Sequence, residues 1–276
     1  MKTNEKVVLV TGASSGIGKE TALYLIGQGH VVYGAARRLE KMSDIEEAGG
    51  HAIAMDITNE DQVRAAVKEI IEAQGRIDVL VNNAGYAVYG AVEDVSITDA
   101  RRQFEVNLFG LAQLTKEVLP YMRGAKSGKI INISSIGGKI YTPLGAWYHA
   151  TKHALEGWSD SLRLELSPFN IDVVIVEPGL IMTEFGEVMS EPLRQNSGQG
   201  PYKDLAEKLI KTTKESYEKP DAGSPPVVIA KVIAKAIDAR RPKTRYAAGK
   251  LAKPLLFVRR YMSDRFFDKA VMSQVK

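Results

Sequence analysis

Cysteine is absent from the 276-residue chain, and histidine occurs only 4 times. The absence of cysteine excludes a disulfide framework, a thiolate metal site and a cysteine nucleophile. His149 and His153 stand four positions apart, but no glutamate supports the pair as it does in zinc enzymes. The sequence therefore predicts no metal site.

Long apolar runs are also missing. No segment approaches the roughly 18 continuous apolar residues of a membrane span. The residues from Met1 to Lys6 lead directly into the short apolar run Val7–Val10, which is too short for the core of a signal peptide. Together with the lack of cysteine, these absences favour a cytoplasmic protein.

Acidic residues are scarce in the last part of the chain. Residues 231–276 contain 13 Lys and Arg against only Asp238, Asp264 and Asp268, although the net charge of the whole chain is +4. Such asymmetry can indicate an anionic partner such as a membrane or a nucleic acid. The interpretation we favour is a solvated surface of a helical tail, without a nucleic-acid partner.

What is present is a regular alternation of apolar runs and helical patterns. A content of 45% hydrophobic and 25% charged residues is ordinary for a globular protein, and the length fits one large α/β domain. Strands are predicted near 6–11, 30–36, 51–56, 77–82, 129–134, 171–177 and 244–248. Helices are predicted near 16–28, 59–74, 97–123, 147–167 and 226–240. The alternation indicates βαβ units and a doubly wound parallel sheet of about seven strands, which binds ligands beyond the carboxyl ends of its strands.

A glycine-rich turn follows the first predicted strand. It reads Thr11-Gly12-Ala13-Ser14-Ser15-Gly16-Ile17-Gly18, and a helical pattern continues from it. A strand, a glycine turn and a helix aim backbone N–H groups at a phosphate. The spacing differs from that of a P-loop, and the alternative is an ordinary turn.

Tyr148 and Lys152 lie four positions apart, and Ser135 precedes them at the end of an apolar run. On a helix this spacing puts the ammonium beside the phenol, and a fixed positive charge lowers the pKa of a phenol. The result is a proton donor near neutral pH. Tyr246 and Lys250 have the same spacing, but no serine at a strand end precedes them, so we interpret Tyr246 as structural.

These motifs together resemble the short-chain dehydrogenase/reductase family, in its single-domain branch. The resemblance rests on Thr11-Gly12-x-x-x-Gly16-x-Gly18, Asn82-Asn83-Ala84-Gly85, Asn107, Ser135, Tyr148-x-x-x-Lys152 and Pro178-Gly179. It covers about residues 5–183 and leaves the last third weakly matched. It implies a Rossmann sheet of seven strands, a nicotinamide cofactor and hydride transfer at a carbonyl or alcohol carbon.

The resemblance also implies roles for individual residues. Tyr148 is the expected proton donor, Ser135 hydrogen-bonds the same substrate oxygen, Lys152 also binds the nicotinamide ribose, and Asn107 relays protons to Lys152 through water. Ser134 would point away, because neighbouring residues of a strand face opposite sides. The residues expected to bind the cofactor are Gly12, Ser14, Ser15, Gly16, Ile17, Gly18, Arg37, Arg38, Asp56, Ile57, Asn83, Ala84, Gly85, Tyr148, Lys152, Pro178, Gly179 and Thr183.

The choice between NADP and NAD depends on the end of the second predicted strand. An NAD enzyme usually carries an acidic residue there, which would repel a 2′-phosphate. This chain has Ala35 instead, followed by Arg37 and Arg38, whose guanidinium groups suit a phosphate. Ser15 stands where many NADP-dependent relatives have a second basic residue. We expect NADP, with NAD as the alternative.

The expected substrate is uncharged and hydrophobic, such as a steroid, a retinoid or an aliphatic ketone, because the candidate pocket walls are apolar. Those walls are Tyr86, Val88, Tyr89, Ile136, Ile140, Tyr141, Leu180, Met182, Phe185 and Met189. Two other functions were weighed: a catalytically idle dinucleotide-binding sensor or scaffold, and a nucleotide-sugar epimerase or dehydratase. The intact set of catalytic residues disfavours the first, and the glycine spacing disfavours the second.

Three further expectations concern the organisation of the chain. Residues 1–250 are expected to form one dinucleotide-binding and catalytic domain, with loops and one polar helix over 184–226 acting as a substrate lid. Residues 251–276 form a basic amphipathic extension, which we expect to cover the pocket; a peripheral membrane contact is the alternative. The family resemblance implies a homo-oligomer built from the two long helices.

Overall fold

Seven parallel strands form one sheet in the computed structural model, which describes residues 5–218 and 223–275. The strands are β1 (Val7–Thr11), β2 (Val31–Ala36), β3 (His51–Ala54), β4 (Val79–Asn82), β5 (Gly128–Ile133), β6 (Ile171–Pro178) and β7 (Arg245–Ala248). Their order across the sheet is β3-β2-β1-β4-β5-β6-β7, and every neighbouring pair is parallel. The chain reverses direction across the sheet between β1 and β4, where such folds open a ligand crevice. The predicted doubly wound Rossmann fold is confirmed.

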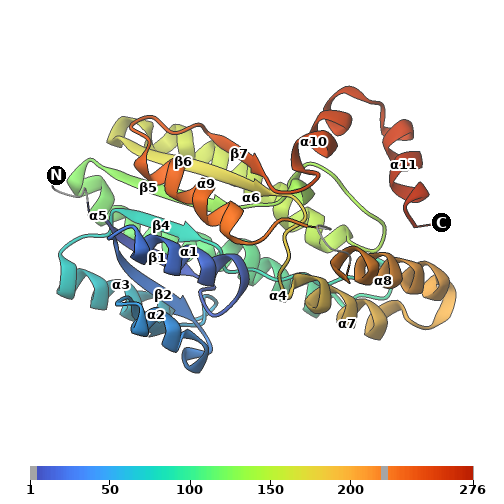
Figure 1. Ribbon diagram of the computed structural model, residues 1–276, viewed down its shortest axis with the longest axis horizontal. Helices are drawn as coiled ribbons and strands as arrows, with labels where there is room; N and C mark the ends of the chain where they lie inside the picture. Colours follow the sequence, from blue (N-terminus) through green and yellow to red (C-terminus); the bar gives the residue numbers. More distant parts are fainter. Residues whose placement is uncertain (1–4, 219–222, 276) are drawn as a thin grey trace.

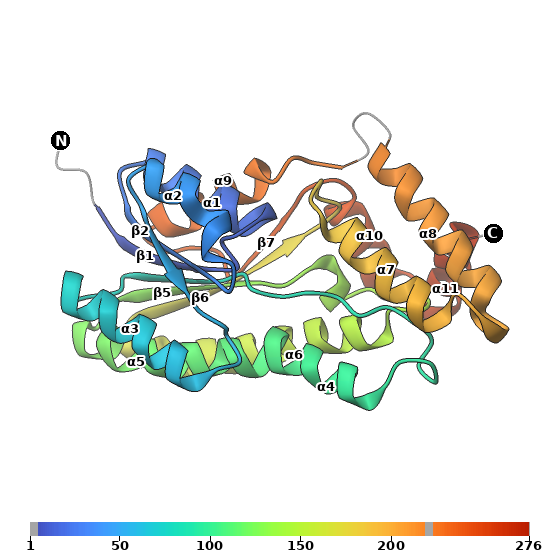
Figure 2. The same ribbon diagram turned by 90° about the horizontal axis from the view of Figure 1, so that it is seen from below.

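Helices cover both faces of the sheet, as Figure 2 shows. One face carries α1 (Gly16–Gly27), α2 (Ser43–Glu47) and α9 (Val227–Asp238). The other carries α3 (Glu60–Gln74), α4 (Ile97–Phe104), α5 (Leu111–Ala125) and α6 (Ala146–Leu166). Because both faces are covered, every residue of β1 and β4 is buried, which explains why these strands are apolar without alternation.

The prediction of a single helix over 97–123 is wrong in one respect. A π-helical turn, Glu105–Gly110, separates α4 from α5. The turn places the Asn107 side chain against the backbone of Tyr86, to which its amide donates at 2.9 Å and from which its oxygen accepts at 3.0 Å. A π turn inserts one extra residue into a helix. The hydrophobic periodicity of the flanking helices does not reveal that insertion.

The region predicted as a lid contains two helices instead of the one expected. They are α7 (Phe185–Ser197) and α8 (Lys203–Glu218), which pack side by side beyond the carboxyl ends of the strands (Figure 1). Residues 219–222 of the predicted lid lie outside the described part of the chain. The glycine and proline residues around 198–201 give a short turn between the two helices.

The C-terminal extension forms α10 (Ala252–Tyr261) and α11 (Asp264–Ser273). Both lie at the same end of the molecule as α7 and α8 (Figures 1 and 2). Over the described ranges, no helix is both long enough and apolar enough to cross a bilayer.

A buried histidine closes the loop that follows β5. The ring of His149, on α6, accepts a hydrogen bond at Nε2 from the backbone N–H of Thr142, so its Nδ1 carries the proton and donates to the carbonyl of Gly137; both distances are 3.0 Å. Burial lowers the pKa of His149 to about 4, although the Gly137 carbonyl opposes this shift. The neutral ring therefore holds the loop between β5 and α6 against the helix.

This histidine makes the stability of the fold depend on pH. Its pKa is 6.5 without the fold and about 4 within it, so the unfolded chain binds more protons between these values. Stability from this group is present above about pH 6.5 and is lost as the pH falls towards 4. Between pH 7 and pH 5 we expect it to remove about 2 kcal/mol from the free energy of unfolding.

Urea unfolding of His149→Gln at several pH values tests this expectation, because glutamine does not titrate. The free energy of unfolding of the variant should fall about 2 kcal/mol less than that of the native chain over this interval. His153→Gln is the matched control and should follow the native curve. Parallel curves for His149→Gln and the native chain would contradict the expectation.

Candidate active site

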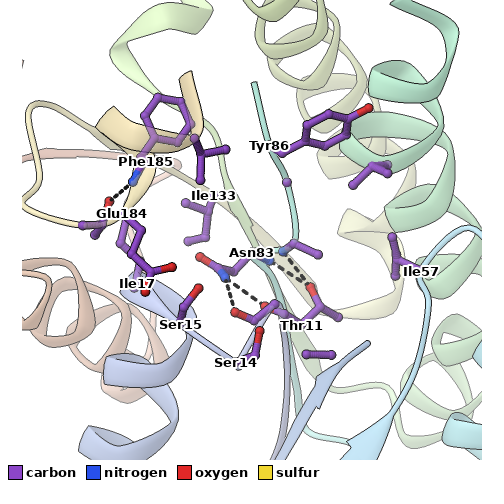
Figure 3. Close-up of a pocket in the computed structure, with 18 of the residues that line it drawn as sticks. Thr11, Ser14, Ser15, Ile17, Ile57, Asn83, Tyr86, Ile133, Glu184 and Phe185 are labelled. Carbon is purple, nitrogen blue, oxygen red and sulfur yellow. Dashed lines mark hydrogen bonds between the residues drawn. The ribbon is translucent and has the colours of Figure 1, made fainter. Parts of the chain in front are cut away.

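A cavity of about 740 Å³ opens at the carboxyl ends of the strands, and Figure 3 shows part of its lining. Its size is within the roughly 300–1,000 Å³ of small-molecule sites. The cavity brings together all of the predicted site residues except Gly18 and Asn107. They are Gly12, Ser14, Ser15, Gly16, Ile17, Arg37, Arg38, Asp56, Ile57, Asn83, Ala84, Gly85, Ser135, Tyr148, Lys152, Pro178, Gly179 and Thr183.

The glycine-rich turn is fastened to the loop after β4. The Thr11 hydroxyl accepts hydrogen bonds from the backbone N–H groups of Asn83 and Ala84, each at 3.0 Å, and the Asn83 amide donates to the Thr11 carbonyl at 2.9 Å (Figure 3). Gly12 has φ +67°, and a Cβ built on it would lie 2.9 Å from the Ala84 Cα. Only glycine fits such a position. Thr11 also lines the cavity, and the sequence signal for it was its place in the motif.

The turn leads into the N-terminus of α1, which faces the cavity through Ser15, Gly16 and Ile17. No side chain caps this helix end, so its first N–H groups remain available to a ligand. Backbone donors at a helix N-terminus suit a diphosphate. The turn therefore fits the phosphate groups of a dinucleotide.

Gly18 lies behind the turn and does not line the cavity. A Cβ built there would lie 2.3 Å from the Gly12 carbonyl oxygen, so a larger residue would push α1 away from the turn. Its place in the motif reflects close packing with Gly12, and its expected part in cofactor binding stays a prediction.

The end of β2 presents two cations at one end of the cavity. Ala35 and Ala36 are buried, whereas Arg37 and Arg38 are exposed. The Arg38 guanidinium lies 3.5 Å from the hydroxyl of Ser14, on the glycine-rich turn. These two residues therefore bring a positive charge and a hydroxyl group to the same place.

Asp56, at the end of β3, is held in a turn by Thr58, whose backbone N–H and hydroxyl donate to it at 2.9 and 2.8 Å. Burial raises the pKa of Asp56, but these hydrogen bonds and the charges of Arg37 and Arg102 leave it below its usual value. Arg102, on α4, also lines the cavity. It was missed because no motif marks it in the sequence.

Lys152 is buried on α6, and its ammonium donates to the carbonyl of Ile133 at 2.9 Å. Burial lowers the pKa of Lys152 to about 8, while the charge of Glu156 opposes that shift. The ammonium also lies near Gly85, since a Cβ built on that glycine would be 3.8 Å from it. The lysine thus joins the end of β5 to the loop after β4.

Ser135 and Tyr148 converge on Gly137. A Cβ built on this glycine would lie 3.1 Å from Cε1 of Tyr148 and 3.2 Å from the Ser135 hydroxyl oxygen, which accepts from the Gly137 N–H at 3.0 Å. The Ser134 hydroxyl lies 2.8 Å from a Cβ built on Gly138, and Ser134 also lines the cavity. The choice of Ser135 over Ser134 therefore stays a prediction. Gly137 was missed, because nothing in the sequence distinguishes it from other loop glycines.

Asn107 is buried beside the cavity without lining it. Besides its two hydrogen bonds with Tyr86, its amide donates to the hydroxyl of Thr151 at 3.1 Å. Its oxygen lies 3.2 Å from a Cβ built on Gly85, on the same side as the Lys152 ammonium. The side chain therefore joins the π turn, the loop after β4 and α6.

Of the apolar residues expected to form the substrate walls, Tyr86, Val88 and Phe185 line the cavity. The Phe185 ring lies 5.5 Å from the Tyr148 ring, between centroids. The others lie elsewhere: Tyr89 packs against Tyr148 and His149, and Tyr141 packs against Phe267 of α11. The lining residues that were not expected include Val188, Asp99, Arg102 and Glu184.

Within residues 5–218 and 223–275, no group of three or more histidine, aspartate or glutamate side chains is placed to hold a metal ion. Tyr246, the second match to the tyrosine–lysine spacing, lies on β7, outside the residues that line the cavity. Its hydroxyl accepts a hydrogen bond from the Lys243 N–H at 3.1 Å.

Comparisons with known proteins agree with this geometry. The 3-ketodihydrosphingosine reductase of Bacteroides thetaiotaomicron is 39% identical over 251 residues, which cover 91% of this chain and 90% of the relative. The NADPH-dependent 3-dehydrocapnine reductase of Ornithobacterium rhinotracheale is 35% identical over 284 aligned residues, 98% of each chain. Among solved structures, the closed form of serine dehydrogenase complexed with NADP+ has a TM-score of 0.76 at 27% identity, covering 89% of this chain and 95% of that one.

The family model for short chain dehydrogenases matches residues 6–194. That range contains the glycine-rich turn, the serine, the tyrosine and the lysine whose positions are described above. The chain therefore belongs to the short-chain dehydrogenase/reductase family of oxidoreductases.

Proposed function

We propose that this protein is an NADPH-dependent ketone reductase acting on an uncharged, hydrophobic aliphatic substrate. The observation that supports this most directly is the convergence of Ser135, Tyr148 and Lys152 on the cavity that the glycine-rich turn also lines. Proton-donating groups and a phosphate-binding turn in one cavity are what reduction of a carbonyl by a dinucleotide requires.

In this proposal, different cavity residues bind different parts of the cofactor. The turn from Gly12 to Ile17 binds the diphosphate, Asp56 and Ile57 the adenine, and the backbone of Asn83 to Gly85 the adenine ribose. Pro178, Gly179 and Thr183 hold the nicotinamide end. A bound nicotinamide cofactor supplies the hydride that reduces the carbonyl carbon.

The chain's own residues supply the proton and hold the substrate oxygen. Tyr148 donates its hydroxyl proton to the carbonyl oxygen, and the Ser135 hydroxyl hydrogen-bonds the same oxygen and stabilises the developing alkoxide. Lys152 stabilises the phenolate that remains, since with a pKa of about 8 it is largely charged at pH 7. Its hydrogen bond to the Ile133 carbonyl fixes the ammonium in place, and we propose that it also binds the nicotinamide ribose.

Asn107 is proposed to complete a water-mediated relay to Lys152. Its side-chain amide is engaged by Tyr86 and Thr151. The π turn also rearranges the backbone hydrogen bonds around it. We therefore propose that the backbone carbonyl of Asn107 binds the relaying water, while the side chain fixes the turn.

Three observations support NADP over NAD. No carboxylate ends β2, Arg37 and Arg38 follow Ala36 there, and the Arg38 guanidinium lies beside Ser14. A guanidinium next to a hydroxyl binds a phosphate well. The relative named as NADPH-dependent 3-dehydrocapnine reductase gives the same preference.

The substrate class rests on the cavity wall near Tyr148. Tyr86, Val88, Phe185 and Val188 provide an apolar surface there, which suits a hydrocarbon chain. The relative from Bacteroides thetaiotaomicron is named 3-ketodihydrosphingosine reductase, which supports a ketone as the substrate. We therefore propose a long-chain aliphatic ketone, with α7 and α8 closing over it as a lid. Purified enzyme with NADPH should reduce such ketones in preference to charged short ones.

Replacing Tyr148 with Phe should lower kcat for ketone reduction about a thousandfold, because the hydroxyl acts chiefly in the transition state. Binding of NADPH, measured by fluorescence, should stay near normal. Ser135→Ala should also be severe. Ser134→Ala is its matched control and should be milder, because the family resemblance assigns the contact with the substrate oxygen to Ser135. Retention of more than a tenth of the activity by Tyr148→Phe, or the reverse order of the serines, would contradict the assignment.

Replacing both Arg37 and Arg38 with Ala should weaken NADPH binding by about 2–4 kcal/mol, as expected for lost charged hydrogen bonds to a phosphate. Binding of NADH should scarcely change. Lys41→Ala removes a neighbouring charge outside the cavity lining and is the control. Titration calorimetry with both cofactors measures the difference, and an equal loss for NADPH and NADH would count against the assignment.

We also propose that the protein is a homo-oligomer assembled through the helices α4 to α6. This surface exposes large apolar side chains, namely Ile97, Phe109, Tyr121 and Leu164, of which Leu164 is 71% exposed. Apolar patches of this kind mark interfaces. Light scattering should give an oligomer for the native chain at micromolar concentration. Phe109→Glu with Leu164→Glu should halve the mass or reduce it further, and a native monomer would contradict the proposal.

A further inference from the structure

The C-terminal helices have an inner face that packs on the enzyme. Phe267 of α11 is 1% exposed and contacts the Tyr141 ring, with 5.2 Å between centroids. The Arg259 guanidinium lies over both rings, at 5.4 and 5.7 Å. The Tyr141 hydroxyl donates to Asp268 at 2.9 Å. The tail is therefore fixed to the loop that follows Ser135.

The outer face of α10 is aromatic and basic. Lys253, Phe257, Arg260 and Tyr261 follow the spacing of one helix face. Phe257 is 60% exposed and Tyr261 is 62% exposed, although their rings contact each other at 4.7 Å. The Arg260 guanidinium lies 5.7 Å from the Tyr261 ring. A solvated helix carries polar residues on its outer side, whereas this face exposes two aromatic rings between its cations.

The outer face of α11 repeats the pattern. Phe266 is 53% exposed and Met272 is 42% exposed, and the exposed residues Arg265 and Lys269 lie among them. We call Lys253, Phe257, Arg260, Tyr261, Arg265, Phe266, Lys269 and Met272 the outer tail surface.

The charged residues of the tail differ in whether they are paired. Both acidic residues are exposed but engaged: Asp264 pairs with Arg259 at 2.8 Å, and Asp268 accepts from Tyr141. Lys253, Arg260, Arg265 and Lys269 take part in none of the ion pairs found among the described residues. The outer tail surface therefore combines exposed apolar side chains with unpaired cations.

We propose that the outer tail surface docks on an anionic phospholipid bilayer. Aromatic side chains that stand among lysine and arginine residues enter the boundary between headgroups and acyl chains, while the cations bind the lipid phosphates. The negative surface of the bilayer complements the unpaired cations of the outer tail surface. This inference goes beyond the proposed reductase activity and does not depend on it.

A second copy of the chain is a poorer occupant. A two-fold contact would place the same surface patch on both sides. The unpaired cations of one copy would then face those of the other, and like charges at an interface oppose association. Docking on an anionic bilayer brings no like charges together.

The location of the outer tail surface indicates what docking on a bilayer would do for the enzyme. The tail touches the lid helix α8, where the Thr212 hydroxyl donates to the carbonyl of Gln274 at 3.4 Å. Figures 1 and 2 show α10 and α11 at the end of the molecule that carries α7 and α8. Docking through the tail would therefore bring the lid end of the cavity towards the lipid surface.

The test is sedimentation of the full chain with vesicles of phosphatidylglycerol and phosphatidylcholine, and with vesicles of phosphatidylcholine alone. We expect at least tenfold stronger binding to the anionic vesicles at low salt, and a large loss of binding in 0.5 M salt. Phe257→Ser with Tyr261→Ser and Phe266→Ser should lower the binding at least tenfold. Arg260→Glu with Arg265→Glu should do the same.

Two controls match these changes. Val92→Ser removes an apolar side chain that is 62% exposed elsewhere, and Lys231→Glu with Lys235→Glu reverses two exposed charges on α9. Both should bind the vesicles as the native chain does. Circular dichroism and NADPH binding check that each variant folds, so a failed reductase assay leaves this test unaffected.

Three results would overturn the proposal. The first is equal sedimentation of the native chain with and without anionic vesicles. The second is folded aromatic and charge variants that bind as well as the native chain. The third is a fall in particle mass by light scattering when the three aromatic residues are replaced, which would make the outer tail surface a contact between copies of the chain.

Discussion

The burial of one ammonium group orders the catalytic end of the molecule. Lys152 is enclosed between the end of β5 and the loop after β4, and the Ile133 carbonyl receives its hydrogen bond. A buried charge needs such a partner. Because α6 carries both Lys152 and Tyr148, fixing the lysine at the strand end also fixes the direction of the phenol. Ser135 and the cavity lie at this same end of β5.

The remaining site depends on the parallel arrangement of the sheet. All seven strands point the same way, so their following loops gather at one edge. Residues as distant in sequence as Gly12, Asn83 and Thr183 therefore meet around one cavity. The hydrogen bonds between Thr11 and the loop after β4 hold two of these loops at a constant separation, whatever ligand occupies the space between them.

Much of this arrangement could be predicted from the sequence, because short local sequence patterns determine it. The buried strands are continuous apolar runs, and the glycine-rich turn has a spacing that only a tight approach of backbone explains. What could not be predicted depends on contacts between distant segments. Arg102 and Gly137 reach the site through packing alone, and the division of the region predicted as a lid into α7 and α8 depends on residues without a distinctive motif.

The residues predicted to form the substrate walls also depended on contacts that the sequence does not reveal. Tyr89 and Tyr141 looked like cavity residues because they are aromatic and lie close to the motifs in sequence. One instead supports the rings of Tyr148 and His149, and the other binds the C-terminal helices. An apolar side chain near an active site can pack either inwards or outwards, and only its neighbours in space decide between the two.

The π turn at Glu105–Gly110 sets the rotational phase between α4 and α5. A helix advances by about 100° per residue, so the extra residue in this turn decides which side of α4 faces the sheet. Deleting any one residue here would turn α4 by roughly a quarter of a circle and carry Asp99 and Arg102 away from the cavity. A change in the length of the turn would therefore displace residues along the whole of α4.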